Sequence, residues 1–470
     1  MTVTLDRPHT TTAAATPHTT DTPHTTTDTT ADRPELPAVT GTELRVPLVT
    51  GEWTRYVNLD YAASAPALRE VAEHVEQVLP YYASVHRGAG YASQVCTGLL
   101  ERARETVGAF VGARADDVVI FTRNTTDALN LLASSVPGSV LCLDIEHHAN
   151  LLPWRGGPHR ALRAADTVER TLEDLAVALA ATPTALLAIT GASNVTGEVL
   201  PVERVVAIAH AAGARVALDA AQLAPHRRVD LAATGVDYLA LSGHKLYAPY
   251  GAGVLVGRRD WLDAAPPHLA GGGAVRAVTE TGTEWAAAPH RHEGGTPNVL
   301  GAAALAQACR ALAPVLAGAA AAHERALLGR LEAGLASVPG VEVLRIWPDS
   351  PDRIAVLSFV VTDRPAGYVA AYMSAEHGIG LRDGKFCAHP LLERLCPGGD
   401  ALRASIGLGT TAEDVDRLVA ALRTLVTTGA SWTYAPVDGR WAPTPDPREL
   451  DPLGVGLPGG PGAGCGTTAA

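Results

Sequence analysis

The segment Ser242-Gly-His-Lys-Leu-Tyr247 places an amine directly after an apolar run that suits a buried strand. Lys245 is one of two lysines in the chain, and arginine supplies all the other basic residues apart from Lys385. A lysine, unlike an arginine, can lose its proton and form a Schiff base with an aldehyde. Two surface lysines left by chance would give the same composition, so the segments around Lys245 must distinguish the two interpretations.

Short apolar runs like the one before Lys245 recur along the chain. They predict strands at 118–122, 140–144, 185–190, 215–219, 238–242 and 254–257, with helices such as 126–134 and 202–212 between several of them. Most of these runs are apolar throughout, as in strands that are covered on both faces. The alternation of strands and helices predicts an α/β fold with a mainly parallel sheet. Ligands bind to such a sheet beyond the carboxyl ends of its strands.

A second unit follows alanine-rich helices near 300–335. It is expected to contain a strand at 354–361, a helix at 368–377 and a closing helix from Thr411, with Thr410 and Glu413 as a capping box. We therefore expect a large domain over 41–310 and a smaller α+β domain over 311–430. Residues 41–57 could pack with the smaller domain.

Both ends of the chain have the composition of flexible tails. Residues 1–40 are rich in Thr, Pro, His and Asp and contain Pro-His-Thr-Thr three times, so we expect this segment to be disordered. Residues 431–470 are rich in Pro and Gly and predict a second disordered tail.

Charge and cysteine usage exclude several classes of protein. The net charge is −12 and no basic block is present, which argues against binding of nucleic acid or an anionic membrane. No apolar stretch reaches the roughly 20 residues of a membrane span, and the N-terminus does not resemble a secretion signal. The six cysteines are scattered without a Cys-x-x-Cys pair, which predicts reduced thiols in a cytoplasmic protein and no metal site.

Four polar segments fall at the ends of predicted strands, where a ligand would bind. They offer, in order, an anion-binding helix start at 122–127, a histidine pair at 146–150, a carboxylate at 219–222 and the amine at 242–247. Each segment alone has an ordinary structural explanation, such as a helix cap. Together they supply a phosphate-binding turn, a histidine ring that can stack on a flat cofactor, a carboxylate partner for a protonated ring nitrogen, and an amine. A phosphorylated aldehyde cofactor held as a Schiff base needs these parts, and pyridoxal phosphate fits them.

These segments, with others between about 53 and 426, also carry a family resemblance. The chain resembles the class V aminotransferase-like enzymes of fold type I, which use pyridoxal phosphate, and within them the group II cysteine desulfurase and selenocysteine lyase branch. The matching stretches are 59–65, 85–88, 124–127, 146–154, 193–197, 219–222, 242–247, 293–298, 382–388 and 403–405. The resemblance implies a fold-type I transferase, with a mainly parallel sheet in a large domain and a smaller α+β domain.

The resemblance implies roles around the cofactor ring. Lys245 would form the Schiff base with pyridoxal phosphate, and Asp219 would pair with the ring nitrogen. His147 would stack on the ring, whereas His148 would point elsewhere. Gln222 would bind the ring hydroxyl, and Asn194 would lie near both the ring and the substrate.

The resemblance also implies how the phosphate is held. Thr125, Thr126, Ser242 and His244 would bind it within one chain. Thr296 would reach it from the other subunit, so the family implies a homodimer.

On the substrate side, the resemblance implies that Arg403 clamps the substrate carboxylate. His86 belongs to a stretch that the family places near the substrate. The Cys387 thiolate would attack the substrate sulfur, so that L-cysteine leaves as L-alanine and Cys387 holds a persulfide. Lys245 would move the α-proton, and the Lys385 ammonium would favour the Cys387 thiolate. A small sulfur-acceptor protein would then take up the sulfur.

Three features differ from the usual group II pattern. Lys385-Phe386 replaces two histidines before Cys387, His389 follows it, and 406–410 lacks an aromatic–Asn pair. All three fall on the substrate side, so they leave alternatives open. A class V aminotransferase, epimerase or C–S lyase acting on a specialised amino acid would need Lys245 but no nucleophilic cysteine. A binding module that only retains the cofactor fold would not turn over any amino acid.

Overall fold

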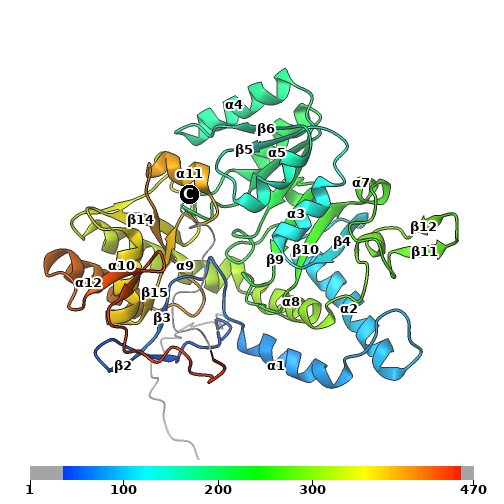
Figure 1. Ribbon diagram of the computed structural model, residues 1–470. Helices are drawn as coiled ribbons and strands as arrows, with labels where there is room; N and C mark the ends of the chain where they lie inside the picture. The colour runs from blue at the N-terminus through cyan, green and yellow to red at the C-terminus, as the bar shows by residue number, and fades with distance from the viewer. Residues whose placement is uncertain (1–34, 457–470) are drawn as a thin grey trace, which may run out of the picture. The chain divides into compact units, whose positions relative to one another are not determined.

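A seven-stranded sheet forms the centre of the computed structural model, which describes residues 35–456 (Figure 1). The predicted disorder over 1–34 and 457–470 lies outside the described residues. The same prediction is corrected for residues 35–40, where Val39 is buried and forms a β-bridge with Leu68, and the Thr40 N–H donates to the Ala67 carbonyl at 2.9 Å. The sheet order is β4-β10-β9-β8-β7-β5-β6. The strands are β4 (Asp117–Thr122), β5 (Val140–Leu143), β6 (His159–Leu162), β7 (Leu186–Thr190), β8 (Arg215–Asp219), β9 (Tyr238–Ser242) and β10 (Gly253–Arg258).

The sheet is parallel except for one strand. β6, β5, β7, β8 and β9 pair in parallel, whereas β10 runs antiparallel to both β9 and β4. All six predicted strands are present, and the prediction of a mainly parallel α/β sheet is confirmed.

Neighbouring residues of each strand pack on opposite faces of this sheet. On β7, Leu187 and Ile189 belong to one buried cluster, whereas Leu186 and Ala188 belong to another. Both faces are therefore covered, which explains why the strands are apolar throughout. The helices packed with these clusters include α2 (Tyr91–Phe110), α3 (Thr125–Ala133), α4 (Val168–Ala181), α5 (Val202–Ala211) and α8 (Val299–Leu312).

A second sheet of four strands has its own buried cluster. Its order is β13-β14-β17-β16, and adjacent strands are antiparallel. The elements are β13 (Val341–Val343), β14 (Val356–Val361), β16 (Arg382–Gly384) and β17 (Ala401–Ser405), with α9 (Ala321–Ala336), α10 (Ala366–His377) and α12 (Ala412–Thr427). The predicted strand and both predicted helices are found here. The division into domains at residue 310 stays a prediction.

Residues 57–65, called here the crossing segment, connect the two sheets. β3 (Val57–Asn58) pairs in parallel with β15 (Ile379–Gly380), beside the second sheet (Figure 1). At the other end of the segment, the Ala65 N–H donates to the His244 carbonyl at 2.8 Å, in the turn that carries Lys245. A single extended stretch therefore contacts both halves of the site described below.

The capping box of α12 lies one residue later than predicted. The Thr411 hydroxyl accepts from the Asp414 N–H, and the Asp414 carboxylate accepts from the Thr411 N–H. Thr410, the predicted cap, instead accepts from the Gly407 N–H within the preceding turn. Asp414 also receives a hydrogen bond from Arg55, which favours this register.

The expectation of a disordered tail from residue 431 is corrected for residues 431–456. β18 (Tyr434–Val437) and β19 (Arg440–Pro443) form a hairpin against α10. The rings of Tyr434 and Trp441 each meet Tyr368 edge to face at 5.4 Å, and Glu376 accepts hydrogen bonds from the Ser431 and Trp432 N–H groups. The packing of these aromatic rings stabilises the hairpin, although the Pro- and Gly-rich composition of the segment is typical of a flexible tail.

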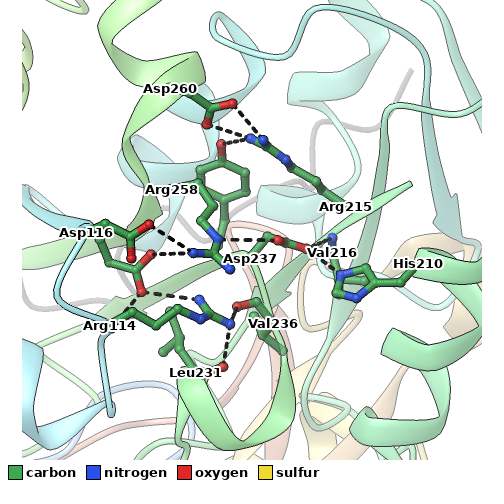
Figure 2. A network of polar contacts seen from close by, with 12 residues as sticks. Arg114, Asp116, His210, Arg215, Val216, Leu231, Val236, Asp237, Arg258 and Asp260 are labelled. Atoms are coloured by element: carbon green, nitrogen blue, oxygen red, sulfur yellow. Dashed lines mark hydrogen bonds and ion pairs between the residues drawn. The ribbon is translucent and has the colours of Figure 1, made fainter. Parts of the chain in front are cut away.

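A charged network ties together the amino ends of the strands, away from the ligand edge. Asp237 accepts from the Val216 N–H at 3.0 Å and pairs with His210 at 2.8 Å, and Arg215 binds Asp260 and the Tyr238 hydroxyl (Figure 2). Because these charged groups are paired with one another, we interpret the network as stabilising the end of the sheet opposite to the site.

No single helix within residues 35–456 has the length and apolar character of a membrane span. One bent pair, α8 with 316–336, meets the length and composition criterion only when its two parts are taken together.

Candidate active site

A cavity of about 480 Å³ lies at the carboxyl ends of β7, β8 and β9. This is the edge at which ligands bind to parallel sheets. Most of the predicted site residues line it. They are Thr125, Thr126, His147, Asn194, Asp219, Gln222, Ser242, His244, Lys245, Cys387 and Arg403.

The start of α3 forms an anion-binding turn on one wall of the cavity. Asn124 caps the helix, its side-chain oxygen accepting from the Asp127 N–H at 3.0 Å. The Thr125 N–H donates to the Ser242 hydroxyl at 2.8 Å, and the two hydroxyls are 2.7 Å apart. A side chain at Gly253 would come within 2.6 Å of the Asn124 Cα atom, so this turn requires a glycine beside it. The start of a helix with hydroxyl groups beside it suits a phosphate.

Lys245 lies in the tight turn that follows β9. A side chain at Gly243 would come within 2.7 Å of the Ala252 carbonyl oxygen, which explains the glycine before His244. Burial, with a smaller contribution from Arg403, lowers the pKa of Lys245 to about 8, although Asp219 opposes the shift. About a tenth of the amine is therefore unprotonated at pH 7, far more than for a lysine with the ordinary pKa, as a nucleophilic lysine requires.

Two buried carboxyl groups, Asp219 and Glu146, belong to this part of the fold. Asp219 ends β8, and burial raises its pKa while Lys245 lowers it. Glu146 is fully buried and accepts from the Asn150 side chain at 2.7 Å and the Thr190 N–H at 3.1 Å. Burial also raises the pKa of Glu146. Asp219 lines the cavity, and a protonated ring nitrogen would provide the positive partner that its carboxylate needs.

His147 presents a neutral ring to the cavity. Burial lowers its pKa to about 3, and the Lys245 charge adds to the shift. Its Nδ1 accepts from the Ala149 N–H at 3.0 Å, which fixes the ring. His148 packs edge to face against His389 at 4.6 Å instead, and its backbone N–H donates to the Cys387 carbonyl at 2.8 Å. A fixed, neutral ring such as His147 suits stacking on a flat ligand.

Cys387 lies in a strained loop between β16 and α11 (His389–Leu395). Phe386 and Cys387 have φ angles of 50° and 53°, in the left-handed region that costs a non-glycine residue about 1–3 kcal/mol. The Asn194 side chain holds this loop by donating to the Phe386 carbonyl at 2.7 Å. Cys387 interacts electrostatically with both Lys245 and Arg403, and positive neighbours favour a thiolate.

Arg403 projects from β17 towards the same cavity. Its Nη1 donates to the Asn194 carbonyl at 2.8 Å, and its Nη2 pairs with Asp60 at 3.1 Å. The guanidinium also lies 5.1 Å from the centre of the Phe386 ring. A cation at this position suits the carboxylate of a small substrate.

Residues 57–418 match the profile of the family described as aminotransferase class-V. The chain belongs to the aminotransferase class-V family. The matched span runs from the crossing segment into α12, so it includes every element that lines the cavity.

Relatives within the aminotransferase class-V family include named enzymes. The chain is 38% identical to the cysteine desulfurase of Dickeya dadantii over 384 residues, covering 77% of this chain and 90% of that one. It is 38% identical to the probable cysteine desulfurase 2 of Mycobacterium leprae over 356 residues, covering 72% and 83%.

Two solved structures are similar in fold. The apo cysteine desulfurase of Thermococcus onnurineus has a TM-score of 0.73 at 30% identity, covering 79% of this chain and 94% of that one. The cysteine desulfurase CsdA of Escherichia coli, in an S-sulfonic acid form, has a TM-score of 0.70 at 33% identity, with the same coverage.

Three residues with predicted roles do not line the cavity. His86 and Thr296 are both exposed and are not among the residues that line it. His86 pairs with Glu101 at 3.0 Å. Lys385 is also exposed and outside the lining, and its action on Cys387 stays a prediction.

Two residues at or beside the cavity had no predicted role. Arg382 lines the cavity from β16, directly across the strand pair from Arg403. Asp60 is not a lining residue, but it binds Arg403. The signal for Asp60 was a carboxylate in the otherwise uncharged stretch 57–65. Within residues 35–456, no group of three or more His, Cys, Asp or Glu is arranged to hold a metal ion.

Proposed function

We propose that the protein is a pyridoxal-phosphate-dependent cysteine desulfurase, which converts L-cysteine to L-alanine and retains the sulfur as a persulfide on Cys387. The observation that carries this proposal is that one cavity brings Cys387 together with Lys245 and Arg403. An aminotransferase or epimerase has no need for a cysteine here. The relatives named as cysteine desulfurases add independent support.

The residues of the cavity fit the cofactor. The start of α3, with Ser242 and His244, offers hydrogen-bond donors for the phosphate, and Asp219 offers a buried carboxylate for the ring nitrogen. His147 supplies a stacking wall, and Lys245 an amine for the aldehyde. When bound, pyridoxal phosphate would act as an electron sink that weakens bonds at the substrate Cα.

Three residues of the chain would then carry out substrate binding, proton removal and sulfur transfer. Arg403 would bind the substrate carboxylate, and Lys245 would remove the proton from Cα. The Cys387 sulfur would form a bond to the substrate sulfur as the bond from that sulfur to Cβ breaks. The electron pair would stay on Cβ, which takes up a proton, so that L-alanine leaves and the sulfur stays on Cys387.

We also propose a homodimer and a sulfur-acceptor protein as partners. The exposed positions of His86 and Thr296 are compatible with residues that complete the site of a second copy. The persulfide on Cys387 would need an acceptor to regenerate the thiol. The cytoplasmic location stays a prediction from the sequence.

The proposed function is tested by incubating the purified protein with pyridoxal phosphate, L-cysteine and a thiol reductant. We expect equal amounts of L-alanine and sulfide, measured by amino-acid analysis and a sulfide assay. Formation of pyruvate and ammonia in place of L-alanine would indicate a C–S lyase. Cofactor binding with no product from L-cysteine would overturn the proposal and direct the search to other amino acids.

The lowered pKa of Lys245 predicts how cofactor loading depends on pH. Only the unprotonated amine can attack the aldehyde, and that form increases as pH rises through the pKa of about 8. The rate at which the cofactor-free protein regains its visible absorbance should therefore rise with pH, with a midpoint near 8. Lys385→Ala should give the same profile. A midpoint near the ordinary lysine value of 10.5 would contradict this explanation.

A further inference from the structure

Arg403 makes two hydrogen bonds through its terminal nitrogens, and its third guanidinium nitrogen has no partner among the described residues. Its side chain is 4% exposed, and it binds the Asn194 carbonyl through Nη1 and Asp60 through Nη2. Its Nε is buried and has no hydrogen-bond partner among the described residues. A buried donor without a partner is costly. Because Arg403 lines the cavity, its guanidinium keeps hydrogen-bonding capacity for a ligand there.

Asp60 is held firmly beside β17 by the crossing segment. The Leu59 carbonyl accepts from the Ser405 N–H at 2.7 Å, and the Ser405 hydroxyl accepts from the Ala62 N–H at 2.9 Å. The Asp60 N–H itself donates to the Asn58 side chain at 3.0 Å. Its carboxylate therefore meets Arg403 from a fixed backbone, and the pair fixes the orientation of the guanidinium.

The surroundings of Asp60 are mainly cationic. Burial raises its pKa, and Arg403, Arg382 and Lys245 oppose that shift, in that order. Tyr56 is the other titratable group that interacts with it. Asp60 therefore neutralises part of the positive charge that would attract a substrate carboxylate.

We propose that Asp60 is a positioning residue that also sets substrate affinity: it orients Arg403, and its charge competes with the substrate carboxylate for the same guanidinium. The identity of that substrate as L-cysteine rests on the proposed function. Because the Arg403 side chain is buried, a substrate carboxylate near it is attracted less strongly when Asp60 already balances part of its charge. The two effects of Asp60 on binding therefore have opposite signs.

Two substitutions separate these effects. Asp60→Asn keeps an oxygen that can accept from Arg403 and removes the charge, whereas Asp60→Ala removes both. Asp383→Asn is the matched control, because Asp383 is a carboxyl group on β16 that does not line the cavity.

The measurement is the dissociation constant of L-alanine, titrated by the visible absorbance of the cofactor-loaded protein. We expect Asp60→Asn to bind L-alanine about tenfold more tightly than the wild type, which corresponds to about 1.4 kcal/mol. Asp60→Ala should bind it about tenfold more weakly, and Asp383→Asn should bind it as the wild type does. Equal affinities in all four proteins, or equal weakening in both Asp60 variants, would overturn the proposal.

Measuring the L-alanine dissociation constants of the wild type and Asp60→Asn over a range of pH provides a second test. This test does not require the Asp60→Ala variant to fold. Protonation of Asp60 should mimic Asp60→Asn, so the advantage of Asp60→Asn over the wild type should shrink as pH falls. An advantage independent of pH would count against competition by charge. Because L-alanine binding requires no desulfuration, loss of L-alanine production from L-cysteine would overturn only the proposed reaction.

Discussion

Replacing Cys387 with alanine is expected to lower L-alanine formation from L-cysteine by at least about 10⁴-fold, the scale on which enzymes lose rate when the attacking group is removed. Cys387 lines the cavity within the electrostatic influence of Lys245 and Arg403. Without its sulfur, no group in the proposed mechanism accepts the substrate sulfur. The measurement is the initial rate of L-alanine release in the presence of a thiol reductant.

Cys396→Ala provides the matched control for this variant. Cys396 directly follows α11, is partly exposed like Cys387, and does not line the cavity. The control should keep the wild-type rate, and both variants should keep the visible absorbance of the bound cofactor, since neither cysteine belongs to the cofactor side. Equal L-alanine formation by Cys387→Ala and the wild type would mean that the sulfur leaves without Cys387.

Lys245→Ala should abolish both covalent attachment of the cofactor and turnover. Loss of a group that moves the substrate proton alone costs about 10²–10⁴-fold in rate, and loss of the amine adds to that cost. The direct measurement is mass spectrometry after borohydride reduction, which converts an imine into a stable secondary amine. We expect the wild type to gain one reduced cofactor per chain and Lys245→Ala to gain none.

The composition of the chain makes this test unusually clear, because Lys385 is the only other lysine. Lys385→Ala should be labelled as the wild type is, and its label should map to Lys245. A label on Lys385, or labelling that persists in Lys245→Ala, would show that the turn after β9 does not hold the cofactor.

The cofactor half of the candidate site could be predicted from the sequence because its parts are local. Thr125, Asp219, Ser242 and Lys245 each lie at or just beyond the end of a strand. In a parallel sheet the carboxyl ends share one edge, so strand prediction alone brings these residues together. Their roles, in contrast to their positions, came from the family resemblance.

The Arg403 environment could not be predicted in the same way, because it depends on distant segments. Asp60 and Arg403 are 343 residues apart in the chain and meet through an ion pair. Arg382 reaches the cavity through its register opposite Arg403, which strand prediction does not specify. The burial of Glu146 could not be predicted from its place beside two histidines, because it depends on contact with Thr190 at the end of β7.

Local patterns also failed where two arrangements were nearly equivalent. Thr410 and Thr411 are adjacent, and each is followed three residues later by an acidic residue, so both fit a capping box. Asp414 accepts a hydrogen bond from Arg55, 359 residues away in the chain, whereas Glu413 comes only within 4.0 Å of the same guanidinium nitrogen. In the same way, composition made 431–456 look flexible, although Tyr434 and Trp441 find aromatic partners on α10.

The β18–β19 hairpin sets a practical boundary for producing this protein. The family match ends at residue 418, within α12, whereas Arg448 still donates to the Ser374 hydroxyl at 3.2 Å. A recombinant chain shortened to the matched span would expose the Tyr368 and Tyr372 rings on α10 to water. Exposed aromatic patches of this kind promote aggregation, so expression should include the hairpin and the residues that follow it through 448.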